Sequence, residues 1–243
     1  MTFGKTWVAC GSVLSTMDVA RDVFARTGEY GAVIHAQTQT AGRGRQGKVW
    51  FTPPEGTQVS MTVIGYPVPL SEAWRLAPLA GVAVVEAITA LLPECELHLR
   101  FPNDVLLNGR KLAGVLIETV VQGQQSVPLI GIGINVNVPA SAFPPELQTQ
   151  ATSLLRELER EITKPIAGAV VKALERLWPE PTESWLPRWH ALLDPDATRV
   201  FVLDGRAQPC RVALLRAEGT LVVETQEGAL RTLPAAQVIF GED

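Results

Sequence analysis

The chain has 243 residues, 47% of them hydrophobic and 19% charged, which is the composition of a folded globular protein and excludes a disordered one. Its formal net charge of −4 excludes a general basic surface, so we expect no nucleic-acid partner and only a local phosphate site. The three cysteines are widely spaced and indicate neither a disulfide framework nor a metal-binding pair. This usage favours the reducing cytoplasm.

The apolar segments do not predict a membrane protein. The first apolar run, Trp7–Cys10, is broken at once by small residues and does not resemble a secretory signal. The longest run, Leu76–Leu92, contains a proline, Glu86 and Thr89, and is short for a bilayer. We therefore expect a soluble chain with no membrane partner.

The first part of the chain predicts strands separated by two helices. The first helix is expected to follow Ser15 as its N-cap, with Asp18 in the acidic position of a capping box, and to end at Gly28. The longest helix is expected over Ser71–Leu92, with Ser71 as its cap. The strands are expected at Trp7–Val13, Ala32–Ala36 and Gln58–Ile64.

From Leu97 to Val138 the pattern indicates a sheet. Asn108-Gly109 lies between two apolar runs and is a strong hairpin signal, and a second turn is expected at Gln122–Gln125. These elements predict an α+β fold with a central mixed or antiparallel sheet and flanking helices. Further helices are expected at Thr152–Glu161, Pro165–Trp178 and Thr182–Leu193.

The C-terminal part of the chain changes in character. Short strands alternate there with glycine-containing turns, as in a small β barrel. The domain boundary is expected near Asp194-Pro195, which predicts a large domain over residues 1–194 and a small β domain over residues 195–243. The strands of the small domain are expected at Arg199–Leu203, Cys210–Leu215, Thr220–Glu224 and Arg231–Leu233.

Residues 41–50 read AGRGRQGKVW and contain the spacing G-x-G-x-x-G. A dinucleotide-binding turn would need a helix at the last glycine and an acidic residue about 20 positions further on. Pro53 and Pro54 forbid that helix, and no acid stands at the required place. The context therefore excludes an NAD-binding turn.

The same loop carries Arg43 and Arg45 between its glycines. Glycines let backbone N–H groups approach a ligand closely, and arginines make bidentate bonds to phosphate or carboxylate oxygens. The loop is therefore either an anion-binding loop or a solvated basic loop.

Lys111 begins a strand that is otherwise apolar. Alternation places its side chain on the same face as Ala113, Val115 and Ile117, and it is oddly placed unless it points into a site or caps the strand edge. Gly114, on the opposite face, indicates that another group approaches the strand closely.

The segment LIGIGINVN, residues 129–137, repeats the glycine signal and adds asparagines among apolar residues. Buried amides need partners, so Asn135 requires either a ligand or a structural network. Asn103 and Asp104 end another expected strand and suit metal or ribose contacts, although a simple Asx turn is an equal alternative.

Five segments stand out in chain order: STMD (15–18), GRGRQGKVW (42–50), RFPND (100–104), KLAGVLIE (111–118) and GIGINVN (131–137). Together and in this order they resemble the motifs of biotin–protein ligases. The resemblance implies a class II synthetase-like biotin/lipoate ligase catalytic fold followed by an SH3-like β barrel. Two positions depart from the usual pattern: Met17 stands where asparagine is common, and Phe101 where tryptophan is usual.

The resemblance also implies the roles of individual residues. Lys111, Arg45 and Arg43 are the expected catalytic residues, and Asp104 is the expected Mg²⁺ ligand. The expected biotin-binding residues are Ser15, Thr16, Met17, Gln39, Arg43, Gly44, Arg45 and Lys111. The expected ATP- or adenylate-binding residues are Gly42, Arg43, Arg45, Trp50, Asn103, Lys111 and Asn135.

The implied reaction uses ATP and biotin as substrates, with Mg²⁺, and modifies a biotin carboxyl carrier domain. Only 14 residues precede Ser15, so the sequence as given predicts no helix-turn-helix repressor domain. Edge strands permit a homodimer. The alternatives are a lipoate or octanoyl ligase with the same architecture, and a non-catalytic module that binds biotin or an adenylate.

Overall fold

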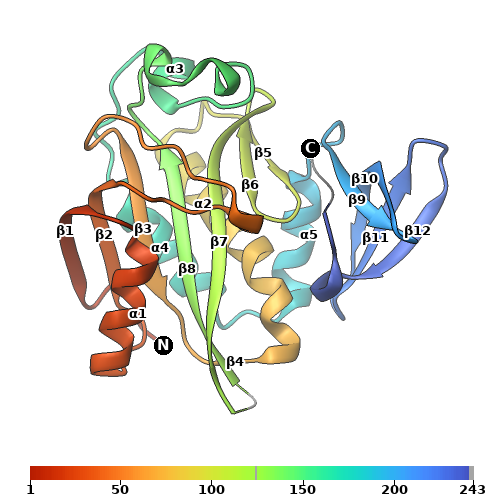
Figure 1. Cartoon of the computed structure of the whole chain (residues 1–243), viewed down its shortest axis with the longest axis horizontal. Helices are drawn as coiled ribbons and strands as arrows, with labels where there is room; N and C mark the ends of the chain where they lie inside the picture. Colours follow the sequence, from red (N-terminus) through yellow and green to blue (C-terminus); the bar gives the residue numbers. More distant parts are fainter. Residues whose placement is uncertain (124, 241–243) are drawn as a thin grey trace.

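The computed structural model describes residues 1–123 and 125–240 and contains one large sheet and one small sheet (Figure 1). The large sheet has the strand order β1-β2-β3-β8-β7-β6-β5, and β4 pairs with β8. β1 and β2 are parallel and the other neighbours are antiparallel, so the predicted mixed sheet is confirmed. Its strands are β1 (Trp7–Val13), β2 (Val33–Gln39), β3 (Gln58–Ile64), β4 (Val68–Pro69), β5 (Leu97–Arg100), β6 (Asp104–Leu107), β7 (Arg110–Gln122) and β8 (Gln125–Asn135).

Helices cover both faces of this sheet. α1 packs on one face against β2, β3 and β8, while α2 and α4 pack together on the other face, joined by α5. The larger apolar core lies on the α2 side, and a smaller one lies under α1. The helices are α1 (Thr16–Thr27), α2 (Leu76–Leu91), α3 (Leu154–Leu158), α4 (Ile166–Leu177) and α5 (Thr182–Leu192). The 3₁₀ turns are Arg45–Gly47, Leu70–Arg75, Ala140–Ala142, Pro145–Leu147 and Ala235–Gln237.

α1 begins and ends where the sequence predicts. The Ser15 side chain accepts a hydrogen bond from the Met17 backbone N–H, and Gly28 closes the helix in the left-handed conformation with φ of 62°. The predicted capping box is wrong, because the Asp18 carboxylate binds the guanidinium of Arg43. The Asp18 carboxylate, which was expected to cap its own helix, therefore binds a loop that is distant in the sequence.

The longest helix starts later than the sequence predicts. Ser71 lies in the 3₁₀ turn Leu70–Arg75, and α2 begins only at Leu76. Pro78 explains the difference. A proline has no backbone N–H, and only in the first turn of a helix does this remove no hydrogen bond of the helix. The helix therefore begins shortly before Pro78. Among the described residues, one helical stretch, Leu70–Leu91, is long and apolar enough to cross a membrane by length and composition. Of an apolar 18-residue window in this stretch, 61% is buried, and its residues form part of the core.

Asn108 and Gly109 join β6 to β7 with φ angles of 52° and 71°, which confirms the predicted hairpin turn. At the second predicted turn, Gln122, the last residue of β7, pairs with Gln125, the first residue of β8, and residue 124 lies outside the described residues. The helix expected at Thr152–Glu161 is shorter than predicted. Ser153 caps α3, which ends where Glu159 turns left-handed with φ of 53°.

The C-terminal sheet has the antiparallel order β12-β11-β10-β9. Phe240 pairs with Phe201 of β9, so the last described residues return to the first strand and close the sheet as in the predicted small barrel. Figure 1 shows this unit beside the large sheet, with α5 leading into it. The domain boundary near Asp194-Pro195 stays a prediction. The strands are β9 (Thr198–Leu203), β10 (Arg206–Leu215), β11 (Thr220–Thr225) and β12 (Leu230–Pro234).

His190 connects α5 to the C-terminal sheet, because its Nε2 accepts a hydrogen bond from the Leu215 backbone N–H at 3.2 Å. Burial lowers the pKa of His190, and burial also lowers the pKa of His35. Both imidazoles therefore favour the neutral form more strongly in the folded chain than in the unfolded chain. In the unfolded chain they take up protons near pH 6.5.

The free energy of unfolding is therefore expected to fall as the pH is lowered from 7 to 5, because the unfolded state binds more protons than the folded state in this window. The variant His190→Gln keeps an acceptor but cannot be protonated, so its stability should depend less on pH. Urea unfolding at pH 5, 6 and 7 measures this. An equal pH dependence in the variant and the parent would contradict the role given to His190.

Candidate active site

A cavity of about 340 Å³ opens on the face of the large sheet that carries α1. β7 and β8 supply its floor, and the glycine loop, residues 41–50, contributes to its walls. Figure 1 shows this loop, in orange, crossing in front of β7 and β8 toward the C-terminal sheet. All predicted site residues line the cavity except Gly42. Gly42 instead closes the base of the loop, where its carbonyl accepts a hydrogen bond from the Trp50 N–H.

One end of the cavity is a buried polar network around Gln39. The Oε1 atom of Gln39 accepts hydrogen bonds from the Thr16 backbone N–H at 2.8 Å and from the Thr16 hydroxyl at 3.0 Å. The Ser15 hydroxyl lies 3.5 Å from the same oxygen. This arrangement fixes the amide of Gln39 and leaves its Nε2 group as the remaining donor. The end of the cavity can therefore bind a small polar head group.

Met17 provides an apolar wall beside this network. Its side chain is 3% exposed, and its Sδ atom would lie only 2.7 Å from a Cβ added at Gly131. Gly131 is therefore needed so that the thioether can lie against β8. A methionine at this position can contact a ligand by packing but cannot donate a side-chain hydrogen bond.

Trp50 explains two of the strand glycines. Its indole lies across β7 and β8, so a Cβ at Gly133 would meet the ring at 2.6 Å and a Cβ at Gly114 would meet it at 3.0 Å. The indole N–H donates to Oε1 of Gln58 at 3.0 Å, which fixes the plane of the ring. The predicted close approach to these glycines is confirmed, and the approaching group is a side chain of the glycine loop.

Lys111 lies in the cavity, but the predicted face is wrong. β6 and β7 pair Leu106 with Lys111 and then Val105 with Ala113, so the register shifts by one residue. A bulge of this kind redirects a side chain. The Lys111 Nζ atom accordingly lies on the face of Gly114, 3.3 Å from the position of a Cβ there. It also lies 5.4 Å from the centre of the Trp50 ring.

Asp104 is the buried carboxylate at the centre of the positive side chains. Lys111 Nζ lies 2.6 Å from its Oδ1 atom, Arg100 donates to Oδ2 at 2.8 Å, and Arg199 also binds Oδ2. Burial alone would raise the pKa of Asp104, but the three cations, Lys111 foremost, outweigh burial and hold the pKa below its ordinary value. The carboxylate is therefore ionised and orients Lys111.

The buried amides form a structural network in this structure. Asn135 donates to the Thr152 carbonyl at 3.0 Å, and Asn103 donates to the Val115 carbonyl at 2.7 Å. The backbone of Lys111 is bound in turn by the same segment, because the Thr152 N–H donates to the Lys111 carbonyl. The amide of Asn135 thus holds the segment around Thr152, and this segment in turn fixes the backbone of Lys111.

Positive charge dominates the cavity. Of the residues that the structure describes, six cationic side chains and one carboxylate, Asp104, line it; the cations are Arg43, Arg45, Lys48, Arg100, Lys111 and Arg199. The described residues include no group of three His, Cys, Asp or Glu side chains placed to hold a metal ion. A divalent cation at Asp104 would face three positive side chains. The cavity therefore fits anions and does not fit a metal ion held by the protein.

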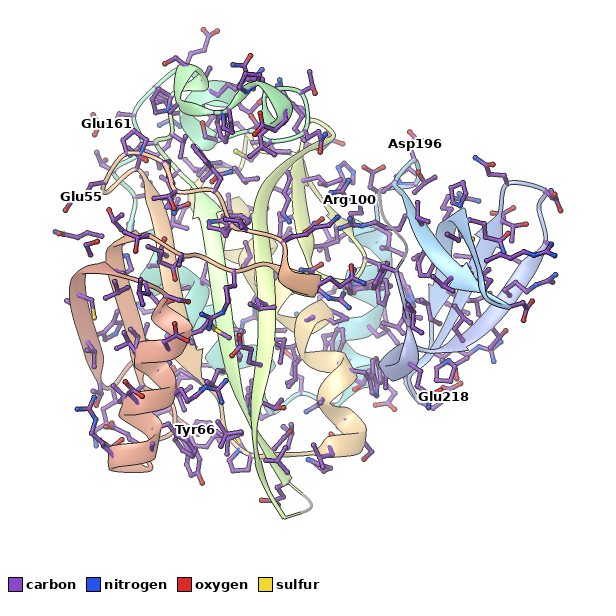
Figure 2. The ribbon with its side chains drawn as sticks, viewed as in Figure 1. Glu55, Tyr66, Arg100, Glu161, Asp196 and Glu218 are labelled. Atoms are coloured by element: carbon purple, nitrogen blue, oxygen red, sulfur yellow. The ribbon has the colours of Figure 1, made fainter. Side chains whose placement is uncertain are left out.

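Sequence reasoning missed two contributors from the C-terminal sheet. Arg199 of β9 reaches Asp104, and Phe240 carries the guanidinium of Arg45 on its ring at 4.8 Å. Gln46 also donates to the Phe240 carbonyl at 3.2 Å. Figure 2 labels Arg100, which lies between the large and small sheets beside this contact. The sequence does contain a signal that could have identified Arg199. It is a positive residue at the start of an apolar strand, the same feature that marked Lys111.

Burial lowers the pKa of the Arg45 guanidinium, Arg199 lowers it further, and Asp104 opposes both effects. Arginine remains charged at neutral pH even so. A cation held beside other cations in a partly buried place is stabilised when an anion binds. The geometry and the charge therefore suit a class of proteins that bind anionic groups beside a small polar head-group site.

Comparison with known proteins gives the same class. Residues 11–135 match the Biotin/lipoate A/B protein ligase family. The bifunctional ligase/repressor BirA of Bacillus spizizenii is 34% identical over 241 residues, which cover 94% of this chain and 72% of that protein. The biotin–[acetyl-CoA-carboxylase] ligase of Mycobacterium tuberculosis is 36% identical over 162 residues, covering 63% of this chain and 57% of that protein.

The fold is also that of a solved ligase. The biotin protein ligase from Aquifex aeolicus in complex with biotin and ATP superposes with a TM-score of 0.77 and 22% identity, covering 98% of this chain and all of that chain. The chain therefore belongs to the biotin/lipoate A/B protein ligase family, as a ligase of the biotin–protein ligase type.

The contact between Trp50 and Gly133 gives a direct test of the site. In Gly133→Ala the new methyl group would overlap the indole, so the free energy of unfolding should fall by about 1–3 kcal/mol. Gly168→Ala on α4 is the control, because a Cβ there meets nothing within 4 Å and alanine favours a helix. Urea unfolding compares the two variants. Equal stabilities would contradict the position of Trp50.

Proposed function

We propose that the protein is an ATP-dependent biotin–protein ligase that forms biotinyl-5′-AMP and then transfers biotin to a lysine of a biotin carboxyl carrier domain. The observation that carries this proposal is the pairing of two features in one cavity. A buried polar head-group site lies at Gln39, and a cluster of cations lies around Lys111. The relatives that are named biotin–[acetyl-CoA-carboxylase] ligases support the choice of biotin.

In the first step, a carboxylate oxygen of biotin attacks the α-phosphorus of ATP. A new bond forms between this oxygen and the α-phosphorus. The bond from the α-phosphorus to the oxygen that bridges the α- and β-phosphates breaks, and pyrophosphate leaves with its electron pair. Two anions must approach each other, so positive charge has to be fixed beside both. Lys111 and Arg45 supply that charge, and Arg43 adds positive charge at the edge of the cavity.

In the second step, the neutral amine of the acceptor lysine attacks the carbonyl carbon of the mixed anhydride. An amide C–N bond forms, the bond from the carbonyl carbon to the phosphate oxygen breaks, and AMP leaves while the amine loses a proton. Water would hydrolyse the same anhydride. The glycine loop, which carries Trp50 across the cavity, excludes water until the acceptor arrives.

The head-group site has the donors and acceptors that a cyclic urea needs. Ser15 and Thr16 offer hydroxyl groups, and Gln39 offers its Nε2 group. Met17 covers the ring by packing, which replaces the amide expected at this position in the resemblance. On the nucleotide side, Trp50, Gly42, Asn103 and Asn135 remain proposed contacts or supports of the adenylate.

Mg²⁺ was expected from the resemblance, with Asp104 as a ligand. The described residues do not fit a metal ion held by this chain, because Asp104 already binds three cations. We assign Asp104 instead to the orientation of Lys111. Any Mg²⁺ that the reaction needs would come bound to the oxygens of the triphosphate.

Mass spectrometry of the reaction mixture tests the function. The protein is incubated with ATP, Mg²⁺ and either biotin or lipoate, and the acyl-adenylate is detected. Biotinyl-AMP and pyrophosphate are expected with biotin. If only lipoate is adenylated, the protein is a lipoate ligase. If biotin binds but no adenylate forms, the protein is a binding module.

Removal of the Lys111 charge is expected to lower the rate of adenylate formation by at least about 100-fold, because that charge lies at the reacting centre. Lys111→Ala is compared with Lys172→Ala, which changes an exposed lysine of α4. Pyrophosphate release reports the rate, and thermal unfolding reports whether the fold is kept. Pyrophosphate release at the parent rate in Lys111→Ala would refute the catalytic role.

A further inference from the structure

The glycine loop is anchored to the rest of the protein at two places. At its tip, Arg45 lies on the ring of Phe240 and Gln46 donates to the Phe240 carbonyl. Within the loop, Arg43 pairs with Val49 as a short antiparallel bridge, so the loop is a small hairpin. The other anchor is the side chain of Arg43, which the proposed chemistry does not fully explain.

The guanidinium of Arg43 forms a two-pronged pair with Asp18. Its Nη1 and Nη2 atoms donate to the two carboxylate oxygens at 2.9 and 2.7 Å, and Nη2 also lies 3.4 Å from Glu118. Glu118 in turn binds Arg21 at 2.6 Å. We call these four side chains the loop clamp. It joins the loop to α1 and to β7, the two elements that hold the head-group site and Lys111.

Two observations distinguish the clamp from an incidental surface ion pair. Its geometry is bidentate and its charges form a network, which are the conditions under which exposed pairs contribute measurably. The hydrogen bond to Arg43 also lowers the pKa of Asp18, in accord with a formed pair. The side chain of Asp18 is 49% exposed and that of Arg43 is 38% exposed. The ion pair between them can therefore dissociate, and salt screens it.

We infer that Asp18 and Glu118 are positioning residues that hold the glycine loop closed through Arg43, and that they set how long the acyl-adenylate stays bound. Closure of the loop does not depend on the proposed function, whereas retention of the adenylate rests on it. Neither carboxylate touches the reacting atoms. Each acts by keeping the hairpin, and with it Trp50, over the floor of the cavity.

Asp18→Asn and Glu118→Gln remove one charge each from the clamp with little change in shape. Asp22→Asn is the matched control, because Asp22 is an exposed acid on the same helix, whereas Arg43 binds Asp18. Asp18→Glu keeps the charge and should restore much of the parent behaviour. Circular dichroism verifies that each variant is folded, and Glu118→Gln tests the clamp from a different element if Asp18→Asn misfolds.

Two readouts are measured on the full chain. Trypsin cleavage after Arg45 and Lys48, identified by mass, reports opening of the ligand-free loop, and the half-life of bound biotinyl-AMP reports retention. Each single clamp variant is expected to be cleaved roughly two- to five-fold faster and to lose adenylate faster by a similar factor. The difference from Asp22→Asn should shrink at about 1 M salt, where the Debye length falls to about 3 Å.

Equal cleavage rates in Asp18→Asn, Glu118→Gln and Asp22→Asn would overturn the clamp. Faster cleavage with an unchanged half-life of the adenylate would overturn its role in retention. If the parent forms no adenylate at all, the proposed function fails, while the cleavage comparison without ligands still decides whether the clamp holds the loop.

Discussion

Asp104 is a carboxylate that is 1% exposed and has Lys111, Arg100 and Arg199 around it. An ionised group at this depth is stable only because the cations compensate for its lost hydration, and removing any one partner leaves a buried charge poorly satisfied. The same cluster gathers β5, β6, β7 and β9 around one point. The large sheet and the C-terminal sheet are therefore joined at the place where the proposed chemistry occurs.

Three positive side chains, Lys111, Arg100 and Arg199, are gathered around the one buried carboxylate of Asp104, so an anionic ligand would meet positive charge at this end of the cavity. The backbone makes room for such a ligand in two ways. A bulge in β7 turns Lys111 toward the cavity, and glycines on β7 and β8 let Met17 and Trp50 lie directly on the sheet. Fixed charges and fixed walls together preorganise the site, so little reorganisation is needed when carboxylate and phosphate meet.

Local signals in the sequence were sufficient for much of the fold. The bounds of β1 and β3, the caps of α1 and the turn at Asn108-Gly109 were all predictable, because alternation, capping and turn chemistry act within a few residues. The motifs also named most of the residues that line the cavity. The late start of α2 was visible in principle, since Pro78 restricts where the helix can begin.

Long-range pairings were not predictable in the same way. The face of Lys111 depends on a register shift between β6 and β7, which no property of Lys111 itself specifies. Arg199 meets Asp104 across 95 positions of sequence, and Asp18 serves Arg43 instead of its own helix. These contacts exist only once the elements pack, so a single sequence offers the residue types but not their partners.

The central claim is that Lys111 is held by Asp104 until a ligand brings a carboxylate and a phosphate to it. A crystal structure with a non-hydrolysable analogue of biotinyl-AMP tests this most directly. The account predicts the head group at Gln39, the acyl-phosphate linkage within hydrogen-bonding distance of Lys111 Nζ, and the glycine loop closed above it. An analogue bound elsewhere, or one bound in the cavity without contact to Lys111, would contradict it.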